Sequence, residues 1–142
     1  MTENHDDYYF NQAGDKARSA MPTLPVHSVY EAKGKHLLLT LEGCDLEFLS
    51  DEKFIRDLTF EAATASGATV LHVSSHGFEP HGVTAVAVLA ESHASIHTYP
   101  ESGVVFWDCF TCGDSCKPEL SIDPLVRKLS PSEVRHQIIE RS

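Results

Sequence analysis

Short apolar runs, each with a glycine at or just before its start, constrain the fold of this chain more than any other feature. Runs of four to eight aliphatic residues between turn residues are typical of β-strands. Four such runs lie at residues 36–41, 68–73, 82–89 and 103–110. A shorter candidate, residues 95–98, lies between the last two. The sequence therefore predicts a sheet of four or five strands.

One stretch has helical periodicity instead. Residues 51–66 place five apolar side chains on one helical face, with Ser50 as the expected N-cap and Gly67 as a left-handed stop: Phe54, Ile55, Leu58, Ala62 and Ala63. Asp123-Pro124 and the segment 130–133 resemble helix starts, so we expect two short helices near the C-terminus. This order of elements predicts an α+β domain, with a mainly antiparallel sheet that carries its helices on one face.

Charge and hydropathy restrict the class of partner. The 142 residues carry 11 Lys and Arg against 21 Asp and Glu, a formal net charge of −10. Nucleic-acid backbones are held mainly by Lys and Arg, so this balance argues against nucleic acid as a partner. The longest mostly apolar run, 83–90, is far shorter than the roughly 20 residues that cross a bilayer. The N-terminus lacks the basic and apolar regions of a signal peptide, so we expect a cytoplasmic protein without a membrane span.

The first 32 residues differ in character from the rest of the chain. They are polar and show no sustained period. We expect an N-terminal arm over residues 1–32 that is mobile or is ordered by pairing with a sheet edge. Residues 33–142 then form a single domain, because their number suits one hydrophobic core.

Three cysteines, Cys109, Cys112 and Cys116, lie close together in the sequence and suggest a zinc site. However, Cys109 and Cys112 are three residues apart at the end of a predicted strand, where side chains alternate between faces. No second Cys-x-x-Cys or His-x-x-x-His pair completes a ligand set. Buried thiols are therefore the favoured interpretation, and a zinc or small-ligand binding module stays open as an alternative.

Histidines are dense between the predicted strands and can act as ligands, acid–base groups or hydrogen-bonded structural residues: His72, His76, His81, His93 and His97. Their spacing alone does not choose among these roles. The sequence lacks the Gly-x-Ser-x-Gly nucleophile elbow, and the serine and histidine that lie five residues apart, Ser92 and His97, have no acidic third member that completes a triad. A hydrolase triad is therefore not predicted.

A set of motifs in the second half of the chain resembles a known family. Glu91-Ser92-His93 is followed by Ile-His-Thr-Tyr-Pro-Glu at 96–101 and by Phe-Thr-Cys-Gly-Asp at 110–114. These segments resemble the pyruvoyl-dependent S-adenosylmethionine decarboxylases of bacteria and archaea, and the resemblance extends over roughly residues 33–114. It implies a two-layer α/β sandwich, and two protomers packed as a homodimer with active sites at the interface.

The resemblance also implies a self-made cofactor and no metal. The Ser92 hydroxyl would attack the Glu91 carbonyl, and the resulting ester would eliminate to leave chains 1–91 and 92–142. A pyruvoyl group would then stand at residue 92 and form a Schiff base with the substrate amine. The matching positions make His97 the proton-transfer group of processing, since imidazoles titrate near neutral pH. They make Cys112 the proton donor of turnover, since thiols are mostly protonated there.

Four further residues match positions that bind the substrate in the family: Phe78, Thr84, Tyr99 and Glu101. By this resemblance, aromatic rings would stack on the adenine and the sulfonium, and Glu101 would hold the ribose hydroxyls. Tyr99 replaces the usual tryptophan and Thr84 the usual serine. The expected product is decarboxylated S-adenosylmethionine for spermidine synthesis.

A second substrate class stays open because some relatives on this scaffold decarboxylate a free basic amino acid such as arginine or ornithine. That substrate would need a carboxylate for its distal cation. Glu79, Asp108 and Asp114 are candidates, although the sequence does not give their directions.

Overall fold

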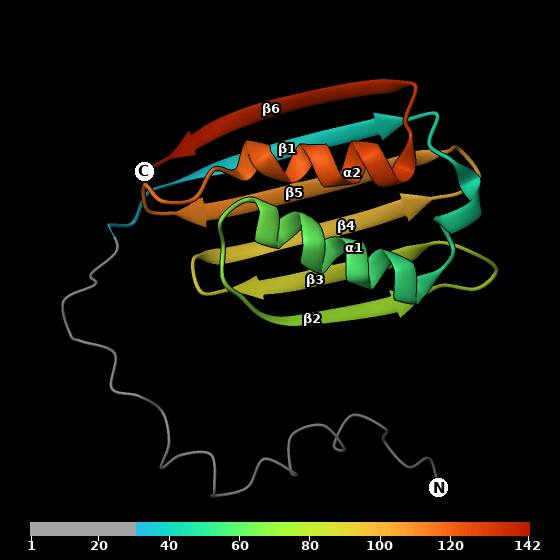
Figure 1. Cartoon of the computed structure of the whole chain (residues 1–142), viewed down its shortest axis with the longest axis horizontal. Helices are drawn as coiled ribbons and strands as arrows, with labels where there is room; N and C mark the ends of the chain where they lie inside the picture. The colour runs from blue at the N-terminus through green and yellow to red at the C-terminus, as the bar shows by residue number, and fades with distance from the viewer. Residues whose placement is uncertain (1–30) are drawn as a thin grey trace, which may run out of the picture.

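The computed structural model describes residues 31–142, so the predicted arm at residues 1–32 lies outside the described residues except for its last two. Six strands form one sheet in the order β2-β3-β4-β5-β1-β6, and every neighbouring pair is antiparallel (Figure 1). The strands are β1 (Gly34–Glu42), β2 (Val70–Gly77), β3 (Val83–Leu89), β4 (Ser92–Tyr99), β5 (Val104–Cys112) and β6 (Glu133–Arg141).

Two α-helices, α1 (Glu52–Ala65) and α2 (Ile122–Leu129), cover one face of this sheet (Figure 1). Two 3₁₀ turns, η2 (Leu46–Phe48) and η3 (Pro118–Ser121), lead into them. The predicted α+β fold, a two-layer sandwich with helices on one face, is confirmed. Within residues 31–142, no helix is long and apolar enough to span a membrane.

The start of α1 corrects one detail of the prediction. Asp51, not Ser50, is the N-cap, and its side chain accepts a hydrogen bond from the Phe54 amide at 2.9 Å. Asp and Ser both cap helices well, so two adjacent candidates are not separable by residue type alone. The stop is as predicted, because Gly67 has a left-handed φ of +86°.

Strand alternation divides the sheet into a core face and an open face. In β1, Leu37, Leu39 and Leu41 point to the helices and are at most 2% exposed. We call the helix-free side the open face. Apolar side chains remain 38–48% exposed on it, namely Leu38, Val86, Val88 and Phe106. A monomer would leave this apolar surface in water.

The C-terminal segment differs from the prediction. The segment 130–133 does not begin a helix; Ser130 is the left-handed C-cap of α2, and the chain turns into β6, which pairs with β1 along its whole length. The Ser-Pro-Ser-Glu pattern imitates a capping box, but the free edge of β1 offers unpaired backbone groups that a strand satisfies. The predicted short strand 95–98 is also longer, because β4 begins at Ser92.

Candidate active site

The Glu91–Ser92 bond lies where the chain turns tightly from β3 into β4. Ala90 and Glu91 form this turn, and Ser92 is the first residue of β4. The Glu91 side chain accepts a hydrogen bond from the Thr69 amide at 2.9 Å. The Glu91 carbonyl oxygen accepts one from the Cys112 amide at 3.0 Å. Both the side chain and the carbonyl of Glu91 are therefore held in place, and the carbonyl is polarised by a backbone N–H.

The backbone at Ser92 is strained. Its φ is +150°, a region that residues with a side chain rarely adopt. Strain of this kind costs about 1–3 kcal/mol per residue and persists only where the surroundings enforce it. The strained residue directly follows the carbonyl that the Cys112 amide polarises. A rearrangement that breaks the Glu91–Ser92 peptide would release this strain.

The cysteines separate as the strand alternation predicts. Cys112 lies at the end of β5 on the open face, whereas Cys109 is fully buried on the core face. Burial raises the pKa of the Cys109 thiol to about 12, and it also raises the pKa of the Cys116 thiol. Cys109 and Cys116 are therefore unreactive packing residues, and the three thiols do not converge on one metal position.

The predicted substrate residues gather at the opposite end of β4. A pocket of about 310 Å³ is lined by all four of them together with His97: Phe78, Thr84, Tyr99 and Glu101. The His97 Nδ1 lies 2.9 Å from the Thr84 hydroxyl. The Glu101 carboxylate lies 3.1 Å from the Nε2 of His81, a partner that sequence reasoning did not assign to this pocket. The only sequence feature that could have pointed to His81 is its position in the loop between β2 and β3.

The structure does not bring His97 to Ser92 within one chain. The two residues are five positions apart on the same strand, and a strand rises about 3.3 Å per residue. Their Cα atoms are therefore separated by roughly 16 Å. Ser92 and Cys112 lie at one end of β4 and β5, and the pocket lies at the other.

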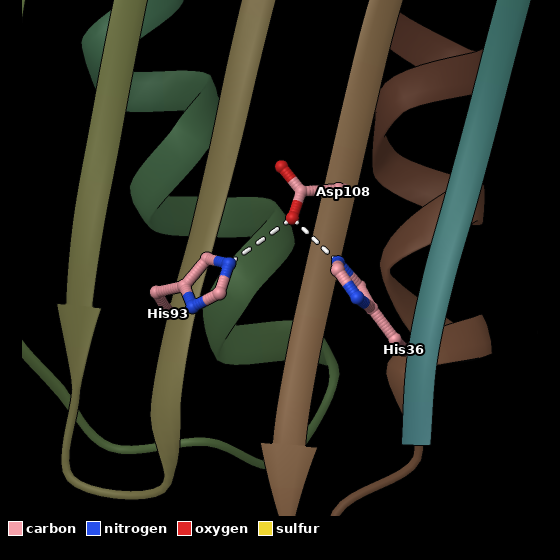
Figure 2. A group of neighbouring side chains, drawn as sticks. All are labelled: His36, His93 and Asp108. Carbon is pink, nitrogen blue, oxygen red and sulfur yellow. Dashed lines mark hydrogen bonds and ion pairs between the residues drawn. The ribbon is translucent and has the colours of Figure 1, made fainter. Parts of the chain in front are cut away.

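Sequence reasoning missed a cluster on the open face beside Ser92, formed by His36, His93 and Asp108 (Figure 2). The Asp108 Oδ2 lies 2.7 Å from the Nε2 of His36 and 3.1 Å from the Nε2 of His93. Figure 2 shows Asp108 on β5 between the two imidazoles, which project from β1 and β4. The chain separates these residues widely, and only the strand order makes them neighbours. We call this group the His–Asp–His cluster.

Asp108 remains a carboxylate in this setting. Burial raises the pKa of Asp108, but hydrogen bonds from Ser95, His36 and His93 outweigh that effect and hold the pKa below its ordinary value. Three donors already contact this carboxylate, so the distal cation of a basic amino acid would have to compete with them.

Within residues 31–142, the side chains of the His–Asp–His cluster are also the ones whose ligand atoms lie close enough together to hold a metal ion. These atoms all lie within 4.8 Å of one another, and two imidazoles with one carboxylate suit several transition metals. In this arrangement both imidazoles bond to Asp108 itself, so a metal would have to replace both hydrogen bonds.

The fold and the turn define a class: a two-layer α/β sandwich with a strained serine behind a polarised carbonyl. A sequence model of the family described as S-adenosylmethionine decarboxylase matches residues 35–142. The chain belongs to the S-adenosylmethionine decarboxylase family.

Individual relatives agree with the family match. The chain is 46% identical over 105 residues to S-adenosylmethionine decarboxylase proenzyme 2 of Bacillus anthracis, covering 74% of this chain and 85% of the relative. It is 45% identical over 108 residues to the proenzyme of Methanococcus maripaludis, covering 76% and 88%. The crystal structure of the adenosylmethionine decarboxylase from Aquifex aeolicus superposes with a TM-score of 0.71 at 37% identity, covering 77% of this chain and 90% of that one.

Proposed function

We propose that this chain is an S-adenosylmethionine decarboxylase that makes its own pyruvoyl cofactor from Ser92. The single observation that carries the proposal is the strained Ser92 next to the Glu91 carbonyl, which the Cys112 amide polarises at 3.0 Å. The family match adds support because it covers this turn and the pocket together. The relatives named above are called decarboxylase proenzymes, which also suits a chain that processes itself.

The geometry of the turn supports self-cleavage. The Ser92 oxygen attacks the Glu91 carbonyl carbon, and the developing oxyanion keeps its hydrogen bond to the Cys112 amide. Breaking the peptide bond leaves an ester and relieves the backbone strain at Ser92. Loss of the residue-92 α-proton then eliminates the ester, which separates residues 1–91, ending in a carboxylate, from residues 92–142, beginning with dehydroalanine. The dehydroalanine tautomerises to an imine, which takes up water and loses ammonia to leave a ketone.

The residues around position 92 fit a pyruvoyl group. The cofactor supplies a ketone that condenses with the substrate amine and accepts the electrons released as CO2 leaves. Cys112 lies on the open face at the end of β5, next to β4, and its amide already contacts residue 91. Its thiol is therefore placed to donate the proton that the former α-carbon requires.

The pocket at the far end of β4 suits the rest of the substrate. Phe78 and Tyr99 are 50% and 41% exposed, so their ring faces are available for an adenine and a sulfonium cation. Glu101 lies in the same pocket and can accept hydrogen bonds from ribose hydroxyls. A pocket of about 310 Å³ is at the small end for a ligand of this size, which is consistent with a second surface completing it.

A symmetric dimer supplies that second surface. Ser92 and the pocket lie roughly 16 Å apart along β4, too far for His97 to reach Ser92 in its own chain. If two open faces pack with their β4 strands antiparallel, the Ser92 end of each protomer faces the pocket of its partner. The same packing buries the exposed apolar residues Leu38, Val86, Val88 and Phe106.

Decarboxylation assays test the proposed function. Purified protein is incubated with carboxyl-labelled S-adenosylmethionine, arginine or ornithine, and released CO2 is counted. We expect release from S-adenosylmethionine only, and none from a Ser92→Ala variant. Release from arginine or ornithine instead would assign the amino-acid alternative.

A further inference from the structure

We propose that His93, held by Asp108, is the general base that removes the proton from the Ser92 hydroxyl during self-cleavage. The inference rests on the proposed function and deepens it, because the family resemblance points only to His97 for proton transfer in processing. It assigns a catalytic role to His93, which the sequence alone does not distinguish from the other histidines between the predicted strands. Asp108 becomes a positioning residue.

The contacts form a continuous relay. The Ser92 hydroxyl oxygen lies 3.4 Å from the Nδ1 of His93. The opposite ring nitrogen of His93, Nε2, lies 3.1 Å from the Oδ2 of Asp108. A serine, a histidine and an aspartate in this order constitute the arrangement that activates a serine nucleophile. His97 of the same chain is roughly 16 Å away along β4, so only the partner's His97 could approach Ser92, whereas His93 contacts the hydroxyl within the chain.

Asp108 also sets the tautomer of His93. A carboxylate only accepts hydrogen bonds, so the His93 nitrogen that faces it must carry the hydrogen. In the neutral imidazole the other nitrogen, Nδ1, then presents its lone pair to the Ser92 hydroxyl. Ser95 and His36 both donate to Asp108 and fix the direction of its carboxylate.

The proposed step balances without any co-reactant. The Ser92 oxygen forms a bond to the Glu91 carbonyl carbon, and its proton passes to the Nδ1 of His93. The bond between that carbon and the Ser92 nitrogen then breaks, and the nitrogen takes the proton back from His93 as it becomes an amine. The products are the ester and a neutral imidazole, so His93 is regenerated.

The first test measures cleavage of freshly synthesised full-length chain over time on denaturing gels. His93→Ala is expected to slow cleavage by about 10²- to 10⁴-fold, the range for loss of a general base. His72→Ala is the matched control, since His72 is an exposed histidine on the edge strand β2, and it should cleave like wild type. If His93→Ala disturbs folding, His93→Gln keeps a polar side chain and is measured the same way.

Hydroxylamine identifies the step that fails, because it splits esters and leaves amides intact. The stalled His93→Ala chain should resist hydroxylamine, since the amide never becomes an ester. A His93→Ala chain that hydroxylamine splits, or one that cuts at the wild-type rate, would overturn the inference. In both cases the wild-type chain still cleaves, so the proposed function stands; failure of the wild-type chain to cleave would overturn both.

The role of Asp108 has its own signature. In uncleaved Ser92→Ala protein, nitrogen-15 NMR of the His93 ring should report hydrogen on Nε2. The added substitution Asp108→Asn offers an amide N–H to that nitrogen and should move the hydrogen to Nδ1, with slow cleavage when Ser92 is restored. A His93 ring that carries its hydrogen on Nδ1 while Asp108 is intact would contradict the relay.

Discussion

The two ends of β4 are built in different ways. At the Ser92 end the backbone is strained and the polar atoms of the turn have assigned partners, such as the Cys112 amide on the Glu91 carbonyl. At the His97 end the strand is regular, and side chains surround an open pocket. The Ser92 end thus combines a strained backbone with the His93 and Asp108 side chains that we propose for bond rearrangement, whereas the His97 end offers the side chains that we propose for substrate recognition. Because the ends are roughly 16 Å apart, we infer that each works with its counterpart in another protomer.

The largest expected effect is an all-or-none rescue between two inactive chains. Ser92→Ala and His97→Ala chains, expressed separately, should each stay uncleaved. When they are co-expressed with different tags, about half of the His97→Ala chains pair with a Ser92→Ala partner that supplies His97. We expect that fraction to be cleaved, as measured by tag-specific blotting. No cleavage, although mixed dimers co-purify, would mean that the two ends do not meet across a dimer.

The next largest effect separates turnover from processing at the Ser92 end. Cys112→Ala keeps the backbone amide that contacts Glu91, so cleavage should continue. It removes the proposed proton donor, so kcat should fall by about 10²- to 10⁴-fold. Cys109→Ala is the control: its thiol is buried in the core, and it should lower stability while leaving kcat unchanged. Unchanged decarboxylation by Cys112→Ala would remove that thiol from the mechanism.

A smaller effect is expected in the pocket. Phe78→Ala should raise KM for S-adenosylmethionine by about tenfold with little change in kcat, because a ring that stacks on the cation contributes equally to ground and transition states. Phe60→Ala is a matched control on α1, since Phe60 is 53% exposed and Phe78 is 50% exposed. Equal KM values for the two variants would mean that Phe78 does not bind the substrate.

The smallest effect concerns acid stability at the Ser92 end. The pKa of Asp108 is lowered in the folded protein, so its stabilising contribution is fully present above the ordinary pKa near 4 and is lost as the pH falls further. Uncleaved Ser92→Ala protein should therefore lose more unfolding free energy between about pH 5 and pH 3 than Ser92→Ala with Asp108→Asn. Urea unfolding across this range measures the difference, and parallel curves would contradict it.

The sequence predicts much of the fold because its signals are local. The four glycine-led apolar runs predict the strands β1, β2, β3 and β5, the short candidate 95–98 predicts part of β4, and the face through Ile55 and Leu58 predicts α1. The strand β6 is missed because its formation depends on the free edge of β1, which is distant in the sequence. A local cap pattern at 130–133 suggested a helix instead.

The residues of the site also differ in whether local sequence patterns predict them. The motif resemblance identifies Ser92, His97 and Cys112 as site residues, but it does not tell how far apart they lie. The length of β4 shows that His97 is distant from Ser92 in the same chain. The cluster of His36, His93 and Asp108 depends on the order β4-β5-β1 and on register, which no local pattern encodes. The carboxylate of Asp108 lies on a neighbouring strand, so no local sequence pattern around Ser92 reveals it as the partner of His93.

Intact mass spectrometry of the purified protein under denaturing conditions tests the central claim most directly. We expect two chains, residues 1–91 ending in a free carboxylate and residues 92–142 lighter by one ammonia than a serine-started peptide. A single uncut chain of 142 residues after long incubation, or a cut at any other bond, would contradict it.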